Sequence, residues 1–185
     1  MFLKIFLYFF LLFNYSLNSY ADEKQLIIDK LLGINNFTFN FEQNTQGGIE
    51  IGNCSIVFDN KLKCNYIDDK QKEIIINNKT LVVIQKRYNK KKIYPISKSP
   101  FLKILSKNSL INLVKESNLE LNDNIDLIYL DEKGKKITII FEKKNYDLIG
   151  WKIVDELQRK IFFSLEIQSI NTEIDHNIFK IPSTN

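Results

Sequence analysis

The sequence predicts a mainly β protein of about ten short antiparallel strands with a few short helices. Apolar and polar residues alternate with period two over most of the chain, and tight turns separate the alternating segments. In residues 93–114 the pattern changes, because Pro95 stops a strand and two short apolar helical segments follow. A long antiparallel meander with one apolar face curls into a sandwich, a barrel or an open half-barrel, and the residues leave these three alternatives open.

Residues 1–21 are expected to be a signal peptide. A basic start precedes an unbroken apolar run over residues 5–13, and Ser19 and Ala21 are small residues at the two positions that a signal peptidase reads. The run is shorter than the roughly 20 apolar residues that a transmembrane helix needs. We therefore expect export, cleavage after Ala21, and a single domain over residues 22–185.

The charge balance argues against a nucleic-acid partner. The formal net charge is only +4, and the heavy use of Lys, Asn and Ile is better explained by an AT-rich genome than by nucleic-acid binding. The densest basic cluster, residues 86–92, lies between two strand patterns. We expect a solvated hairpin tip there, and the alternative is a docking patch for an acidic partner or for anionic headgroups.

The regular elements are expected to follow one another with short connections. A short amphipathic helix is expected over residues 22–34, with Leu26, Ile27, Leu31 and Ile34 at helical spacing. Strands are expected over residues 37–43, 49–58, 62–66, 73–77, 80–86, from 93, and over 119–121, 125–130, 136–142, 148–155 and 160–170. On the apolar faces of three of these strands we place Phe37, Phe39 and Phe41, then Ile149, Trp151 and Ile153, and then Ile161, Phe163, Leu165 and Ile167.

The helical interruption begins with Ser99, a good N-cap, and Pro100, which suits the first helical turn. A break at residues 106–108 separates its two apolar segments. They carry Phe101, Leu102, Ile104 and Leu105, and then Leu110, Ile111, Leu113 and Val114. Both segments need an apolar surface to lie on, so they are either a core-packing insertion or a lid over a cavity.

The interior is expected to be partly empty. Closed barrels of about eight strands are just wide enough to be filled by side chains or to hold one small ligand. Ten or eleven strands enclose more volume, and three short apolar helices are the only plugs that the sequence offers.

No catalytic constellation can be assembled from the sequence. The single histidine, His176, lies in a turn near the C-terminus, and no nucleophile elbow, zinc-protease motif, P-loop or dinucleotide fingerprint accompanies it. We therefore expect no enzyme activity, no catalytic residue, no metal site and no cofactor. Trp151 is more readily explained as a core residue than as a ligand contact.

The two cysteines lie on the two arms of one expected hairpin. Export would permit a disulfide between Cys54 and Cys64. The expected register places them diagonally, about 7 Å or more apart, which is too far for good disulfide geometry. Buried free thiols are therefore favoured over a bridge.

Taken in chain order, these elements resemble the periplasmic outer-membrane lipoprotein carriers, the LolA-type family, over essentially the whole mature chain. The marks are an aromatic strand ending in glutamine, a basic-aromatic strand ending in tyrosine, a proline pair leading into an apolar helix, a tryptophan strand running into Asp, and a C-terminal Ile-Asn-Ile-Phe-Pro pattern. In this sequence they are Phe37 to Gln43, Leu62 to Tyr66, Pro95 to Leu105, Leu148 to Asp155, and Ile170, Asn171, Ile174, Phe179 and Pro182.

The resemblance implies an unclosed antiparallel β-barrel of about 10–11 strands, with short helices forming a lid over its concave apolar face. It also implies a carrier in the periplasm of a Gram-negative bacterium, which shields lipoprotein acyl chains on the way from the inner to the outer membrane. Its partners would be acylated lipoproteins, an inner-membrane lipoprotein-releasing ABC transporter and an outer-membrane lipoprotein receptor. We expect a monomer with no nucleic-acid partner. The alternative is a lipid- or lipoprotein-binding sensor or receptor domain of the same fold, which does not ferry cargo.

The residues expected to form the acyl cavity and lid are Phe39, Phe41, Leu62, Lys63, Phe101, Ile104, Leu105, Trp151 and Phe163. One departure from the family affects the lid. Members commonly carry Arg-Pro where this chain has Phe58-Asp59, and that arginine is implicated in holding the lid shut. Lys63 is the nearest basic candidate to replace it, and the alternative for Lys63 is a solvent-facing strand residue.

Overall fold

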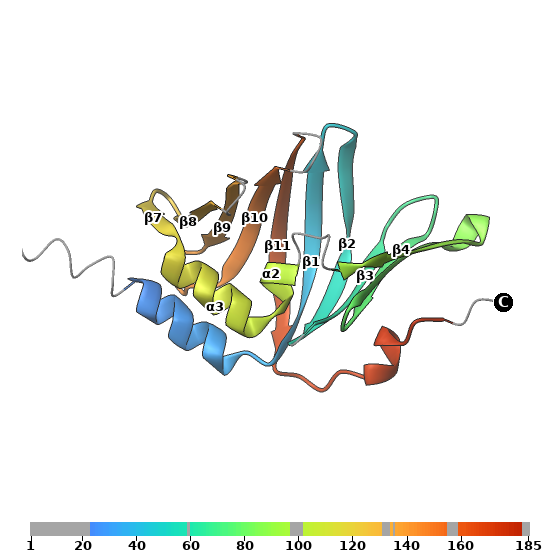
Figure 1. Cartoon of the computed structure of the whole chain (residues 1–185), viewed down its shortest axis with the longest axis horizontal. Coiled ribbons are helices and arrows are strands. Elements are labelled where there is room, and N and C mark those ends of the chain that lie inside the picture. Colours follow the sequence, from blue (N-terminus) through green and yellow to red (C-terminus); the bar gives the residue numbers. More distant parts are fainter. Residues whose placement is uncertain are drawn as a thin grey trace, which may run out of the picture.

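An 11-stranded antiparallel sheet forms the body of the protein, and helices cover one of its faces (Figure 1). The computed structural model describes residues 23–58, 60–96, 102–130, 134, 136–154 and 159–182. The strand order is β6-β5-β4-β3-β2-β1-β11-β10-β9-β8-β7, so the barrel is not closed between its end strands, β6 and β7. The expected mainly β, unclosed antiparallel architecture with short helices over one face is confirmed.

Successive strands from β1 to β6 and from β7 to β11 are hydrogen-bonded neighbours, whereas α2 and α3 separate β6 from β7, and β1 pairs with β11. Their bounds are β1 Asn36–Thr45, β2 Gly48–Val57, β3 Lys61–Tyr66, β4 Lys72–Asn77, β5 Thr80–Gln85, β6 Lys90–Pro95, β7 Asn118–Leu121, β8 Ile125–Leu130, β9 Lys136–Phe141, β10 Leu148–Val154 and β11 Lys160–Ile170. The helices are residues 23–33, α2 Leu102–Leu105 and α3 Lys107–Glu116, with the 3-10 turns η1 Lys86–Tyr88 and η3 His176–Phe179.

The concave face, defined as the face that carries Phe37, Phe39 and Phe41, holds the main core. These three side chains are buried and belong to one cluster with the buried residues of the N-terminal helix, α2 and α3. The opposite face is called the outer face. Period-two alternation therefore identified the buried side of β1 correctly, because one face of an antiparallel strand packs on the core while the other meets solvent.

A bulge changes the expected face of β10. The pairing with β9 shifts between Leu148 and Gly150, so that Leu148 lies opposite Phe141 and Gly150 opposite Ile140. Leu148 is buried and Ile149 is half-exposed. The expectation that Ile149 shares the apolar face with Trp151 is therefore wrong, because the extra residue in a bulge breaks strict alternation.

The two longer helices bury apolar stripes, with one difference from expectation. In helix 23–33, Ile28 is buried in place of Leu26, whose side chain is 40% exposed. The four residues expected on the second helical segment are all buried on α3. The expected break at 106–108 is the start of α3, since Ser106 is its N-cap and accepts a hydrogen bond from the amide of Ser109. Ser99 and Pro100, expected to begin the first segment, lie outside the described residues.

A reciprocal pair of lysines holds helix 23–33 against α3. The Nζ of Lys24 donates to the carbonyls of Lys115 and Ser117 at 3.0 and 2.5 Å, at the C-terminal end of α3. Lys107, at the start of α3, donates to the carbonyl of Leu32 at 3.3 Å. Each helix thus presents the negative end of its dipole to a cation from the other, which stabilises the antiparallel pair.

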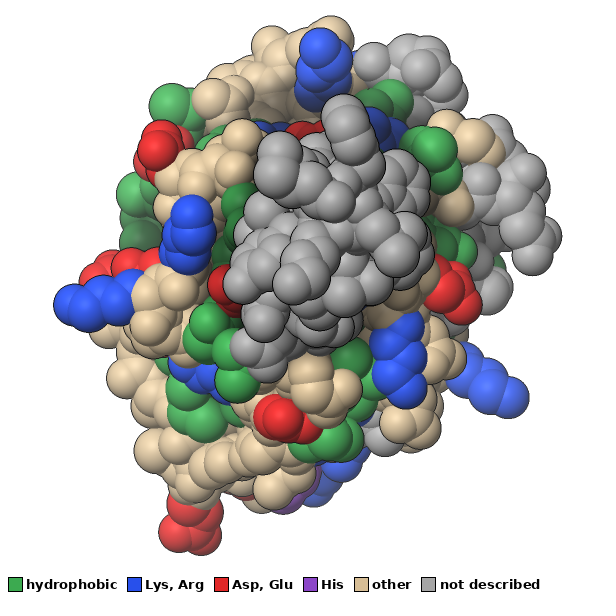
Figure 2. Space-filling model, turned by 90° about the vertical axis from the view of Figure 1, so that its left-hand side faces the viewer, with side chains coloured by type: hydrophobic (Ala, Val, Ile, Leu, Met, Phe, Trp, Pro, Cys, Tyr) green, Lys and Arg blue, Asp and Glu red, His purple; other side chains and the backbone are tan. Residues whose placement is uncertain are grey.

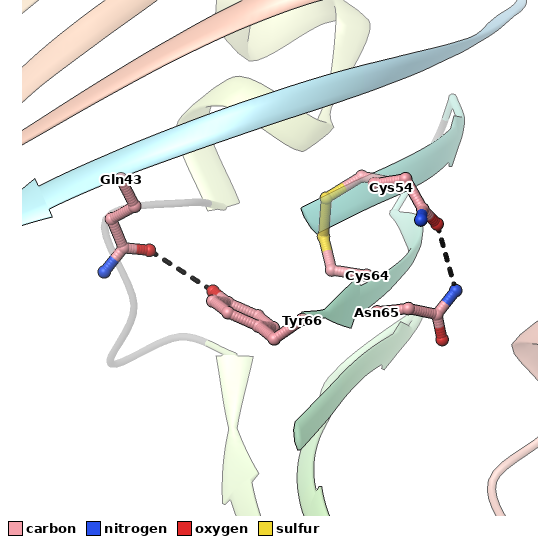
Figure 3. The surroundings of a disulfide bond; sticks show 6 residues. Gln43, Cys54, Cys64, Asn65 and Tyr66 are labelled. Carbon is pink, nitrogen blue, oxygen red and sulfur yellow. Dashed lines mark hydrogen bonds between the residues drawn. A yellow bond between two sulfur atoms is a disulfide. The ribbon is translucent and has the colours of Figure 1, made fainter. Parts of the chain in front are cut away.

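The cysteine prediction is wrong, because Cys54 and Cys64 form a disulfide (Figure 3). The hairpin closes with Val57 opposite Lys61, and each cysteine lies three residues from that pair, so the two face each other directly. Their Cα atoms are 4.1 Å apart, close to the spacing of a non-hydrogen-bonded antiparallel pair. The expected diagonal placement assumed a different register.

The C-terminal segment covers part of the outer face. Ile75 and Val82 point away from the main core and are nevertheless buried, as is Phe179 of η3. Asn77 on β4 donates a hydrogen bond to the carbonyl of Phe179 at 3.2 Å. No helix in the described ranges has both the length and the apolar character required to cross a bilayer.

Candidate functional site

A row of aromatic rings crosses the middle of the concave face. Trp151 on β10 stacks on Phe163 of β11, with ring centroids 4.3 Å apart, and Phe163 stacks on Phe41 of β1 at 4.9 Å. Phe41 then meets Tyr66 of β3 edge to face, also at 4.9 Å. Four strands thus contribute one continuous aromatic surface, which pairs of rings at these distances stabilise beyond the area that they bury.

Gly52 on β2 makes this row continuous. It lies between Phe41 and Tyr66, paired with both. A Cβ at Gly52 would lie 2.7 Å from the Phe41 ring and 2.2 Å from the carbonyl oxygen of Asn65. Because glycine has no side chain, the rings from β1 and β3 meet across the intervening strand.

Helix α2 and the start of α3 cover the concave face. Ile104, Leu105 and Leu110 are each at most 2% exposed and lie in the same core cluster as the aromatic row. The amide of Asn60, in the β2–β3 turn, donates a hydrogen bond to the carbonyl of Leu105 at 3.2 Å. This bond ties the end of α2 to the hairpin that carries the disulfide.

As far as the described residues show, the space under the helices is nearly filled, so the expected partly empty interior is wrong for this closed arrangement. A cavity of about 10 Å³ remains beside Ile104, bounded by side chains from helix 23–33, β1, α3 and β10. That volume is at the lower limit for a single water molecule. Buried side chains of the lid, Ile104 and Leu105, occupy part of the interior that the strand count predicted to be partly empty.

A larger depression, of about 470 Å³, lies across the sheet on the outer face. Asp126, Lys136 and Lys152 are among its lining residues, together with Thr138 and Phe162. Several fixed charges make this depression a poor environment for a hydrocarbon chain, because leaving a charge without water is costly. The concave face, although closed, is the better candidate for an apolar ligand.

A polar cluster ends the aromatic row at β3. The hydroxyl of Tyr66 donates a hydrogen bond to Gln43 at 3.2 Å (Figure 3). The Nζ of Lys72 lies 3.6 Å from the centre of the Tyr66 ring and pairs with Glu50. Burial, and then the negative charges of Glu50 and Asp68, raise the pKa of Tyr66, so the hydroxyl stays protonated and remains a donor. The apolar strip therefore has a polar margin.

The structure brings together most of the residues expected from the sequence. Seven of them are buried members of the core cluster on the concave side: Phe39, Phe41, Leu62, Ile104, Leu105, Trp151 and Phe163. Phe101 lies outside the described residues. Tyr66 and Gly52 were not among the residues expected to form the cavity and lid. Pairing Phe41 with Gly52 and Tyr66 in register would have identified both.

Lys63 lies apart from this group. It points to the outer face, where its Nζ is paired with the carboxylate of Glu73, and Lys86 pairs with the same carboxylate. Burial alone would raise the pKa of Glu73, but the hydrogen bonds and charges of Lys63 and Lys86 outweigh it and lower that pKa. Within the described part of the chain Lys63 therefore makes no lid contact that would replace the arginine implied by the resemblance.

Neither the concave face nor the rest of the described residues offers a metal centre. Within the described ranges, no group of three or more His, Cys, Asp or Glu side chains is placed to hold a metal ion. What the concave face offers is apolar area with a polar margin, which is suited to binding.

Comparison with known proteins gives one family. A model of the family described as outer membrane lipoprotein carrier protein LolA matches residues 33–182. An uncharacterized conserved protein from Thermus thermophilus has a similar structure, with a TM-score of 0.53 and 9% identity over 88% of this chain and 94% of that one. A chain of the Pseudomonas aeruginosa MucA/MucB complex gives a TM-score of 0.51 and 8% identity, over 89% of this chain and 61% of that one. At such identities the two structures show a shared fold only. No curated protein gives a significant match.

Proposed function

This chain belongs to the outer membrane lipoprotein carrier protein family, LolA, whose fold points to lipid or lipoprotein binding outside the cytoplasm, and we propose that it is a periplasmic carrier of lipoprotein acyl chains. The observation that carries the proposal is the buried aromatic row on the concave face, which shares one core cluster with Ile104 and Leu105 of α2. In the proposed cycle an acylated lipoprotein is received from an inner-membrane ABC transporter and handed to a receptor at the outer membrane. Residues 1–21 direct export and are removed, which leaves residues 22–185 as one carrier domain.

The physical need for such a carrier is strong. Each methylene removed from water contributes about 0.8 kcal/mol, so acyl chains leave a membrane only if another apolar surface receives them. The concave face supplies that surface from Phe39, Phe41, Trp151 and Phe163. In the proposed site their rings contact the acyl chains, and none of them takes part in a chemical reaction.

The lid must move for cargo to bind. The cavity of about 10 Å³ beside Ile104 is too small for an acyl chain, so the chain has to take the place of lid side chains. Helix α2 is the natural moving part, since it has four residues and such a short helix has little stability of its own. Helix α3 is braced by the lysine pair to helix 23–33, so we expect it to move less. Displaced Ile104 and Leu105 would return to the concave face when cargo leaves.

A fluorescent fatty-acyl probe tests the site. The mature protein is expected to take up the probe with submicromolar to micromolar affinity. Phe41→Glu and Ile104→Glu are expected to abolish uptake while circular dichroism shows a retained fold, because each places a charge on the apolar face. Leu130→Glu is the matched control, since Leu130 is 59% exposed. Equal uptake by the wild type and both concave-face variants would remove the concave face as the site.

A second candidate function is a sensor or receptor domain that binds lipid or lipoprotein and keeps it. The shared fold with a chain of the MucA/MucB complex favours this candidate, since that protein is in a complex with a protein partner. A transfer assay separates the two. The protein is loaded with a triacylated lipoprotein and mixed with outer-membrane vesicles. A carrier releases its cargo to the vesicles, whereas a sensor or receptor domain retains it.

A further inference from the structure

The edge strand β6 and its η1 turn form a basic edge, defined here as residues 86–95. Its sequence, KRYNKKKIYP, holds five basic residues and no acidic one. Among the described strands, β6 is an end strand of the sheet and pairs only with β5. The tip of this hairpin projects at the right of Figure 1, at the opposite end of the sheet from helix 23–33.

Apolar and aromatic side chains are exposed among these cations. Tyr88 is 50% exposed, Ile93 is 55% exposed and Tyr94 is 44% exposed. Tyrosine is enriched at membrane interfaces, where its ring meets the acyl boundary and its hydroxyl meets water. Lysines interleaved with exposed aromatic and aliphatic groups are the composition of surfaces that bind anionic lipids.

We propose that the basic edge docks on an anionic lipid surface. The attraction comes mainly from the lysine run, residues 90–92. Lys86 is paired with Glu73, and Arg87 donates to the carbonyl of Asp69 in the neighbouring turn. Lys91 donates to the carbonyl of Pro182, an uncharged partner, so its full charge remains available to a lipid phosphate.

Protection of the sheet edge is the competing explanation. Lysine and proline on an end strand prevent it from pairing with another chain, and β6 carries both. That role needs charge alone, and it does not account for two exposed tyrosines and an exposed isoleucine beside the lysines. Lipid docking needs the charged and the interfacial groups together, so it explains the whole set.

The basic edge is followed directly in the chain by a residue of the main core. β6 ends at Pro95, and the next residue, Ile96, is buried in the main core that α2 covers. A lipid surface held at β6 would therefore lie next in the chain to a side chain of that core. The docking proposal does not depend on the carrier function, because a surface can be bound without any acyl chain being taken up.

Vesicle flotation tests the proposal. Mature protein is expected to float with vesicles of phosphatidylcholine mixed with phosphatidylglycerol, and not with phosphatidylcholine alone. Binding should weaken as salt rises, since surface charges are screened within about 8 Å at 0.15 M. Each lysine near an anionic surface raises the affinity about fivefold. The variant K90Q/K91Q/K92Q is therefore expected to bind the vesicles on the order of 100-fold more weakly. I93S/Y94S should also weaken binding without changing its salt dependence.

A variant with the same loss of charge elsewhere is the control. Lys136, Lys143 and Lys144 are exposed, and K136Q/K143Q/K144Q is expected to bind vesicles as the wild type does. The side of the molecule that faces the viewer in Figure 2 shows both positive and negative side chains around its margin. No flotation with anionic vesicles, equal flotation with neutral ones, or equal loss in both triple variants would each overturn the proposal. Uptake of the acyl probe by K90Q/K91Q/K92Q is measured in parallel, so that failure of docking and failure of the carrier proposal are told apart.

Discussion

Gly52 shows at the scale of one residue how the sequence shapes the site. The aromatic row has to pass from β1 to β3 across β2, and any side chain at Gly52 would meet the Phe41 ring and the backbone of Asn65. Neither the ring, which is packed on Phe163, nor a strand carbonyl moves easily. The need for glycine here is steric, and it follows from pairing rather than from a turn.

Gly52→Ala is therefore expected to lower the free energy of unfolding by about 3 kcal/mol, at the upper end of what overpacking usually costs. Urea denaturation followed by circular dichroism measures it. Gly33→Ala is the matched control, because a Cβ at Gly33 would meet nothing within 4 Å. Equal stability of the wild type and Gly52→Ala would mean that Phe41 and Tyr66 do not pack across β2 as described.

Glu73 gives a pH-dependent prediction. Lys63 and Lys86 lower its pKa below the ordinary value of 4.5. A carboxylate whose pKa is lowered by folding stabilises the folded state above its unfolded pKa, and this contribution is lost as pH falls through the folded pKa. Glu73→Gln should reduce stability by about 1 kcal/mol at neutral pH, given the modest strength of such pairs. Below pH 4.5 the difference from the wild type should shrink. Urea denaturation at a series of pH values measures the difference in stability between the wild type and Glu73→Gln, and Glu166→Gln, at an exposed position, is the control. A difference that stays constant with pH would contradict the account.

At the scale of elements, the β2–β3 hairpin supports the lid. Its disulfide joins Cys54 to Cys64 on the concave side, and its turn bonds to the end of α2 through Asn60 and Leu105. Both sulfurs belong to nearly fully buried residues of the main core. A cross-link here restricts the unfolded chain and keeps the hairpin in the register that α2 contacts.

Cys54→Ala/Cys64→Ala is expected to lower the free energy of unfolding by about 2–4 kcal/mol. Reductant should destabilise the wild type by a similar amount and leave the double variant unchanged, and denaturant titrations with and without reductant measure this. Thiol counting on protein unfolded without reductant provides the independent readout. Two reactive thiols in that assay would contradict the bridge.

The strands show which features of the fold could be predicted from the sequence and which could not. Alternation depends only on which side of a strand meets water, so the buried faces of β1 and β11 could be predicted. Register and bulges depend on how neighbouring strands pair, and no local pattern encodes that pairing. The cysteine prediction failed for this reason, and so did the placement of Ile149. Leu26 was misplaced because neighbouring positions at the margin of a helix's apolar stripe differ little in pattern.

At the scale of the whole molecule, the helices cover the concave face of the sheet, and the apolar side chains of both are buried against each other. The resemblance to the lipoprotein carriers implied an unclosed barrel, and the apolar segments after Pro95 were expected to be either a core-packing insertion or a lid. That the cover's own side chains would fill the interior could not be predicted, because filling depends on how far the sheet curls around them. In the proposed cycle, the concave face contacts lid side chains in the closed form and acyl chains in the loaded form. Because the lid contacts form again when cargo leaves, release of the cargo remains possible.

Trp151 is the only tryptophan of the chain, and it is buried within the aromatic row, so its fluorescence reports on the proposed site alone. Titrating the mature protein with a fatty-acyl chain brominated near its middle is the most direct measurement, because bromine quenches tryptophan only at close range. The account predicts strong quenching that saturates with acyl-chain binding, and little change with the unbrominated chain. Saturating binding of the brominated chain, shown by sedimentation, with no quenching of Trp151 would place the acyl chain elsewhere and contradict the account.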